Sequence, residues 1–124
     1  MENNIIEAKR YIANAKDILR EKAKKEDGFY QDSKYVKMAG HTAYSGILVA
    51  LDFYYGKKTK GRKSVDWYKD NLRKEDKKTL NYFVSAYDLL HLSLGYDGNP
   101  SAKTASTGLE YAEHIINWVA MKTA

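Results

Sequence analysis

Apolar residues recur at steps of three and four along most of the chain, and this spacing predicts α-helices. In the first stretch, residues 3–25, the apolar positions are Ile5, Ala8, Ile12, Ala15 and Leu19, with charged residues on the opposite face. The same pattern predicts a second helix over about 31–55, a short helix over 64–72, a third long helix over about 75–94 and a last one over roughly 100–121. We find no stretch whose alternation is typical of a β-strand.

Residues that favour helix ends lie near the borders of these stretches. Ser64 is a good N-cap, because its hydroxyl can accept a bond from a free backbone N–H of the first turn. Asp32 and Ser33 are possible N-terminal residues of the second helix, and Asn99 followed by Pro100 suits the start of the last one. Glycines that favour helix termination follow the first three long stretches: Gly28, Gly56 and Gly95.

Four long helices, one short helix and short connections predict an all-α fold, an up-and-down four-helix bundle with one extra short helix. A chain of 124 residues suits one domain, residues 1–124. The chain has no cysteine, which excludes disulfides and thiolate metal sites. Its start lacks the order of a signal peptide, and its longest wholly apolar run, 47–51, is far too short for a membrane span. We therefore expect a cytoplasmic protein that does not enter a membrane.

The segment 38–56 is apolar around most of its circumference, and small residues recur through it. Such a helix must be packed on several sides, by its own bundle or by a second subunit. Gly40, Tyr44 and Gly46 are the candidate interface residues, and they predict a homo-oligomer or a small protein partner. The polar positions that share a strip of this helix are His41, Ser45 and Asp52.

The net charge of +5 is concentrated in one segment. Residues 57–78 hold ten Lys and Arg against four Asp and Glu. The densest cluster consists of Lys57, Lys58, Lys60, Arg62 and Lys63. Clustered cations attract phosphates, and the neighbouring Trp67 and Tyr68 could stack on bases. The alternative is that the loop is only solvated and that Trp67 holds the short helix against the bundle.

The three histidines form no metal motif, and the sequence contains no glycine-rich phosphate cradle, so we expect neither a metal nor a cofactor. His91 lies on the apolar face of its helix. It is either a core histidine that hydrogen-bonds a tyrosine or a carbonyl, or a cleft residue near Tyr96 and Asp97. Ser45 and His41 lie one helical turn apart, but a nucleophilic serine needs a strand-to-helix turn that is missing here.

Four stretches resemble the HEPN-like helical bundles, including the substrate-binding partners of minimal nucleotidyltransferases: KRYIANAKDIL, HTAYSGILVALDFYYG, AYDLLHLSLGYDG and GLEYAEHIINWV. The resemblance is a pattern of residue classes that spans most of the chain. It implies a nucleotide-handling partner or an RNA-cleaving toxin, whose active members carry Arg-x4–6-His. No arginine lies four to seven positions before His91 or His114, so the nuclease activity is not carried over.

Three functions follow in order of preference. The first is a non-catalytic HEPN-like interaction or binding module that acts through a homodimer or a protein partner. The second is nucleic-acid or nucleotide binding through the basic segment 57–78. The third is a degenerate nuclease that uses His91 with Tyr96 or Asp97.

Overall fold

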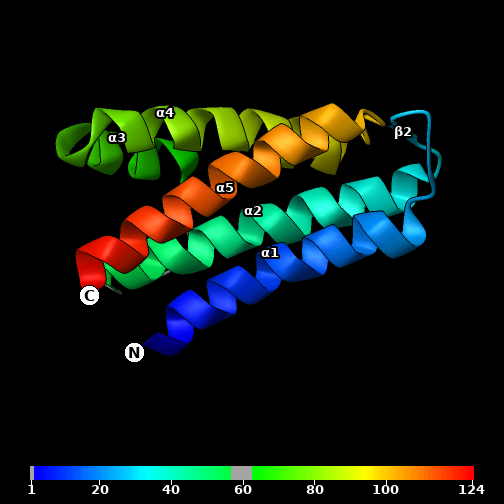
Figure 1. Cartoon of the computed structure of the whole chain (residues 1–124). Helices are drawn as coiled ribbons and strands as arrows, with labels where there is room; N and C mark the ends of the chain where they lie inside the picture. The colour runs from blue at the N-terminus through cyan, green and yellow to red at the C-terminus, as the bar shows by residue number, and fades with distance from the viewer. Residues whose placement is uncertain (1, 57–62) are drawn as a thin grey trace.

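The computed structural model describes residues 2–56 and 63–124, and it confirms an all-α fold. Five α-helices and one π-helix, η1, account for most of the described residues (Figure 1). Their bounds are α1 Glu2–Lys22, α2 Ser33–Tyr55, α3 Val65–Glu75, α4 Lys77–Ala86, η1 Tyr87–Tyr96 and α5 Ala102–Thr123. None of the described helices is long and apolar enough to cross a membrane.

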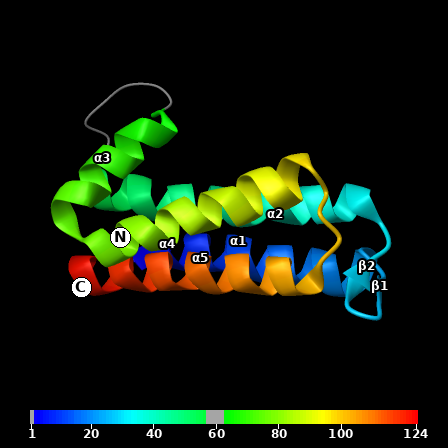
Figure 2. The same cartoon turned by 90° about the horizontal axis from the view of Figure 1, so that it is seen from above.

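The long helices run side by side along one elongated body, in which both chain ends lie at the end opposite the short hairpin (Figures 1 and 2). η1 continues α4, and α3 is folded against the outer end of this pair. The predicted stripes of α1 and α5 form the core: Ala8, Ile12, Ala15, Leu19, Leu109, Ala112, Ile116 and Val119 are all buried. The 3.6-residue spacing therefore located the interior of these helices correctly.

The structure corrects the expectation that the chain has no strand. Strand β1 (Lys25–Glu26) pairs antiparallel with β2 (Phe29–Tyr30) between α1 and α2. Asp27 and Gly28 form the turn with φ of 52° and 83°, and two successive positive values suit the Asp-Gly dipeptide of a tight hairpin. The hairpin is anchored to the start of α5, because the Tyr30 N–H donates to the Pro100 carbonyl at 2.7 Å.

The predicted N-caps of α2 and α3 are present, since the Ser64 hydroxyl accepts from the Trp67 N–H and the Asp32 carboxylate accepts from the Lys34 N–H. Gly56 follows α2 with a positive φ of 72°, but its ψ of −179° is not that of the predicted left-handed residue. Gly28 lies in the hairpin turn and does not end α1. The start of the last helix was placed too early, since its N-cap is Ser101. Asn99 instead shapes the turn before it, where its side-chain oxygen accepts from the Ser101 N–H at 2.9 Å.

The predicted division between the short helix and the helix over about 75–94 is present, because Asp76 is extended (φ −160°, ψ 110°) and separates α3 from α4. The prediction of one regular helix from there on is wrong. The winding changes from α to π at Tyr87 and continues to Tyr96, past the predicted end. The Asp97 N–H donates to the Leu92 carbonyl five residues earlier, which is the spacing of a π-helix.

Two glycines proposed as interface residues are instead buried inside this chain. A Cβ on Gly40 would lie 2.5 Å from the Leu90 carbonyl oxygen, and one on Gly46 would lie 2.8 Å from the Cβ of Tyr11. Gly40 thus lets η1 approach α2, and Gly46 lets α1 approach α2. Tyr44 is also buried, with 7% of its surface exposed. The small residues of α2 therefore serve packing within the monomer.

Candidate functional site: the histidine cleft

The polar strip of α2 lines a cleft of about 440 Å³ between α2, α3 and η1. We call it the histidine cleft; its lining residues are His41, Tyr44, Ser45, Leu48, Asp52, Lys63, Val65, Tyr68 and His91. His41 and Asp52 are eleven residues apart on one helix, so the cleft is elongated, with a histidine end and a charged end separated by roughly 16 Å. A cleft with apolar walls and a few convergent polar groups is the usual form of a small-molecule site.

At the histidine end, aromatic rings from two helices surround His91. Its ring centroid lies 4.6 Å from that of Tyr44, 5.1 Å from Tyr87 and 5.0 Å from Tyr96. His41 completes the cluster at 5.5 Å from both His91 and Tyr96. The contacts among His41, His91 and Tyr96 are edge-to-face, and those of His91 with Tyr44 and Tyr87 are tilted, two arrangements that aromatic rings favour. No carboxylate takes part in these ring contacts.

His91 has one ring nitrogen, Nδ1, that is buried and makes no hydrogen bond. Burial lowers the pKa of His91 from 6.5, and the nearby His41 lowers it further, so the imidazole is neutral at pH 7. Orphaned buried N–H groups are rarer than orphaned acceptors, which favours the tautomer with a bare Nδ1. In that tautomer the proton resides on Nε2, and the buried Nδ1 is an acceptor without a donor partner.

At the charged end, Asp52 is held by two donors. Its Oδ1 accepts from the Tyr68 hydroxyl at 2.6 Å and from the Lys63 ammonium at 3.2 Å. Tyr68 is 3% exposed, whereas the side chain of Asp52 is 43% exposed. The positive and negative charges of the cleft therefore neutralise each other by direct contact.

The π-helix positions His91. Gly95 approaches α2 so closely that a Cβ there would lie 2.8 Å from Cε1 of His41, and Gly40 provides the matching gap on α2. π-helical segments are rare and occur frequently at functional sites. In η1, a five-residue step from His91 leads to Tyr96, which brings these two rings together.

The structure brings together two of the three residues predicted for a cleft at the end of this helix. His91 and Tyr96 are in ring contact, whereas Asp97 is exposed and has only its backbone N–H in the helix end. Tyr96 is not one of the residues that line the cleft, and it is 61% exposed. The sequence reasoning missed the wall contributed by α3, namely Val65 and Tyr68. Asp52 is a charged residue on a largely apolar helix, and this was the one sign in the sequence that polar side chains from another element contact it.

Most of the predicted polyanion site lies outside the described residues, namely Lys57, Lys58, Lys60 and Arg62. Lys63 is described, and its ammonium is engaged with Asp52 and lies 5.4 Å from the Trp67 ring centroid. The described remainder, residues 63–78, holds six cations and four acids, so it is only weakly basic. Trp67 packs its ring against Tyr55 at 5.4 Å and against Tyr68 at 5.3 Å, which supports the role of anchoring α3.

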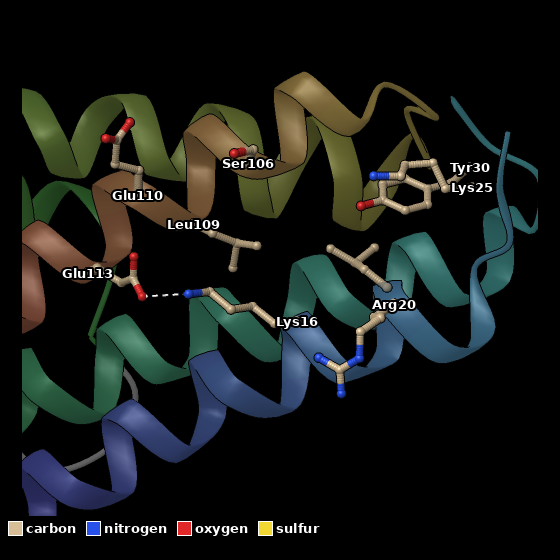
Figure 3. A pocket seen from close by; sticks show the side chains of 9 residues that line it. Lys16, Arg20, Lys25, Tyr30, Ser106, Leu109, Glu110 and Glu113 are labelled. Carbon is tan, nitrogen blue, oxygen red and sulfur yellow. Dashed lines mark hydrogen bonds and ion pairs between the residues drawn. The ribbon is translucent and has the colours of Figure 1, made fainter. Parts of the chain in front are cut away.

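A second cavity, of about 540 Å³, lies between α1, α5 and the hairpin (Figure 3). We call it the α1–α5 groove. Leu19 and Leu109 line it, and the exposed ion pair between Lys16 and Glu113 crosses it at 2.7 Å. Figure 3 shows the Arg20 guanidinium turned away from the groove, where it pairs with Asp17 and Glu21. Long exposed side chains form its polar rim, and such groups are readily rearranged by solvent.

The fold and the histidine cleft together define a small helical domain that contains a pocket. The comparisons with known proteins also identify the chain as one domain of this kind. Residues 3–121 match the model of a family described as a domain of unknown function, DUF5618, so the chain belongs to that family. A solved structure of a protein of unknown function from Dyadobacter fermentans is similar: it is 65% identical, has a TM-score of 0.94 and covers 98% of this chain and 97% of that chain. A search of curated proteins found no match.

Proposed function

We propose that this chain is a non-catalytic, HEPN-like binding module, an up-and-down four-helix bundle whose ligand enters the histidine cleft. The observation that carries the proposal is His91, a neutral imidazole with an unpartnered buried nitrogen in a fixed ring cluster that lines a cleft. Buried polar groups without partners are unusual in folded proteins, so each one needs an explanation, and a ligand that completes the bonding is one. The Tyr55 hydroxyl is also buried without a partner, but Tyr55 lines neither the cleft nor the α1–α5 groove. The α1–α5 groove is larger, yet it contributes no such atom among the described residues.

The role as a binding module rather than an enzyme is supported by what surrounds the histidines. Phosphate-ester cleavage needs a cation near the developing negative charge. The rings around His91 come from Tyr44, Tyr87, Tyr96 and His41, and Lys63 is engaged by Asp52 at the other end of the cleft. A degenerate nuclease centred on His91 therefore has little support from the described residues.

A homodimer through α2 is no longer the preferred mode of interaction. Gly40, Tyr44 and Gly46 are covered by the chain's own helices, so they offer no surface to a second copy. We therefore assign the proposed binding role to the polar strip of α2, which lines the cleft, and not to the small residues of that helix.

The test compares two matched substitutions, Ser45→Trp in the histidine cleft and Ser106→Trp in the α1–α5 groove. Both serines are exposed helix residues that line a cavity, so an indole can fill the space without burying a polar group. Backbone amide shifts of the labelled protein would be recorded by NMR with five fragments: phenol, indole, hypoxanthine, benzoate and benzylamine.

We expect at least one fragment to shift the amides of His41, Ser45 and His91, with loss of the effect in Ser45→Trp and retention in Ser106→Trp. Thermal unfolding of both variants controls for misfolding. If no fragment moves these amides, or if both variants respond alike, the cleft is not a binding site and the proposal fails.

A further inference from the structure

The α1–α5 groove is longer than the cavity drawn in Figure 3. A further cavity, of about 490 Å³, continues it towards the chain ends between the same two helices. Lys16 and Glu113 line both cavities, so their ion pair lies in the middle of one long groove. The two helices run in opposite directions (Figure 1), and each forms one wall.

The two walls of the groove carry opposite charges. Every basic residue of the lining comes from α1 or from β1, which follows it: Lys9, Lys16, Arg20 and Lys25. Both acidic residues of the lining, Glu110 and Glu113, come from α5, so a basic stripe lies beside an acidic one. Arg20 is engaged by acids of its own helix. Lys9, Lys25 and Glu110 form no ion pair within the described part of the chain.

The end of the groove that lies towards the chain ends has an exposed apolar side chain on each wall. Ile6 of α1 is 50% exposed and Met121 of α5 is 69% exposed. A rise of about 1.5 Å per residue, counted from the contact of Lys16 with Glu113, places them about 15 and 12 Å along the groove. The two side chains therefore lie at nearly the same level on opposite walls.

A surface with one basic and one acidic stripe is complementary to itself. A two-fold axis parallel to the groove places α1 of one copy on α5 of the other, so each basic stripe meets an acidic one. Residues that share a level within one chain then face each other between the copies: Lys16 meets Glu113 of the second copy, and Ile6 meets Met121 of the second copy. An axis across the groove would place like charges together, which is unfavourable.

We propose that the α1–α5 face binds a second copy of this chain, in a two-fold dimer held by the two charged stripes and by Ile6 and Met121. Two helices side by side present a face of about 30 by 20 Å, so the dimer would bury about 1,200 Å² in total, the lower limit of specific interfaces. The face is mostly charged, and water fills the remainder of such contacts. The dimer is therefore weak and sensitive to salt.

Sedimentation equilibrium of the native chain at about 0.05 M and about 0.5 M salt tests the interface, because the higher concentration screens exposed charges. We expect self-association at low salt and a dissociation constant at least about tenfold higher at high salt. A chain that stays monomeric at low salt, or a dimer that salt does not weaken, would overturn the proposal.

The key variants are Lys16→Glu and Glu113→Lys, which place like charges on facing stripes. Each alone should raise the dissociation constant at least about tenfold at low salt. An equimolar mixture of the two should associate as the native chain does, because each substituted side chain meets the opposite charge of the other variant. Both positions are about half exposed, so thermal unfolding should show folded chains. A mixture that associates no better than either variant alone would show that the two-fold arrangement is wrong.

The apolar end is tested with Ile6→Ser, which should raise the dissociation constant at least about fivefold because a partly exposed side chain is no longer covered. Leu92→Ser is the control, since Leu92 is exposed on η1, away from both walls. Equal effects of the two substitutions would remove the apolar contact from the interface.

These results are independent of the proposed function, because no residue that lines the groove also lines the histidine cleft. A chain that binds fragments in the cleft but stays monomeric would overturn only the dimer. A dimer whose cleft binds no fragment would overturn only the proposed function.

Discussion

The histidine cleft and the α1–α5 groove are cavities of similar size with opposite construction. The groove is lined by long charged side chains that pair with each other on the surface, as Lys16 does with Glu113, each about half exposed. In the cleft, short side chains and rings are held by glycine contacts and by a buried tyrosine. Volume alone would favour the groove, whereas the bonding state of the polar groups favours the cleft. The proposed function therefore rests on the bonding state of the polar groups and not on the size of the cavity.

The largest effect should come from Gly40→Ala. The new methyl group would lie 2.5 Å from the Leu90 carbonyl oxygen and 2.7 Å from the Gly95 nitrogen, so backbone must move apart. We expect the free energy of unfolding to fall by about 3 kcal/mol in urea denaturation, with loss of the α2–η1 contact.

Gly108→Ala is the matched control, because its methyl group would meet the Leu90 side chain at 2.7 Å rather than backbone. A side chain can rotate away, so a smaller loss is expected. Equal losses in the two variants would show that the approach of η1 to α2 is not set by Gly40.

A smaller effect is expected from Tyr68→Phe, which removes the donor that fixes Asp52. The bond is short, at 2.6 Å, and its donor residue is buried, so the free energy of unfolding should fall by about 1–2 kcal/mol. Tyr54→Phe is the control on a more exposed site, where the hydroxyl donates to Glu75 at 2.7 Å and raises the pKa of Tyr54 to about 12. A Tyr54→Phe loss as large as that of Tyr68→Phe would mean that the charged end is no more rigid than the surface.

The histidine end should make stability depend on pH. The pKa of His91 is lower in the folded chain than its ordinary 6.5, so the unfolded chain binds more protons as the pH falls. The stabilising contribution is complete above pH 6.5 and is lost progressively between that value and the lower folded pKa. The groups in ring contact with His91 are His41, Tyr44, Tyr87 and Tyr96, and none is an acid that could offset the charge.

The measurement is the urea midpoint between pH 7.5 and 5 for the native chain and for His91→Phe. We expect a flatter profile in the variant. Parallel profiles would show that another group causes the acid sensitivity.

The smallest effect should come from Lys16→Met, which removes the ion pair across the α1–α5 groove. Both partners are about half exposed, and exposed pairs contribute little, so we expect a change below about 1 kcal/mol that shrinks further at high salt. A loss of stability comparable to that of Tyr68→Phe would mean that the polar groups of the groove contribute as much as those of the cleft, and the contrast between the two cavities would not hold.

The sequence predicted the buried faces of α1 and α5 well, because the stripe of apolar residues on an amphipathic helix is the side that packs into the core. It also placed His41, Ser45 and Asp52 on one strip of α2, and that strip lines the cleft. It did not predict the π-helix. The spacing of Tyr87, Leu90 and Leu94 fits an α-helix, whose backbone hydrogen bonds span four residues, and gives no sign that the bonds here span five. The interface role of Gly40 and Gly46 was misassigned because small residues permit close approach by any helix, and only the fold decides whether that helix belongs to the same chain.

The wider turn of η1 has a consequence for finding this site in other chains. Because the backbone bonds there span five residues, His91 and Tyr96 are aligned by a step of five, which a search pattern built on steps of three and four would discard. A search for the same arrangement should therefore allow the spacing H-x4-Y. A one-residue deletion between the two rings would separate them even if the rest of the domain folded unchanged.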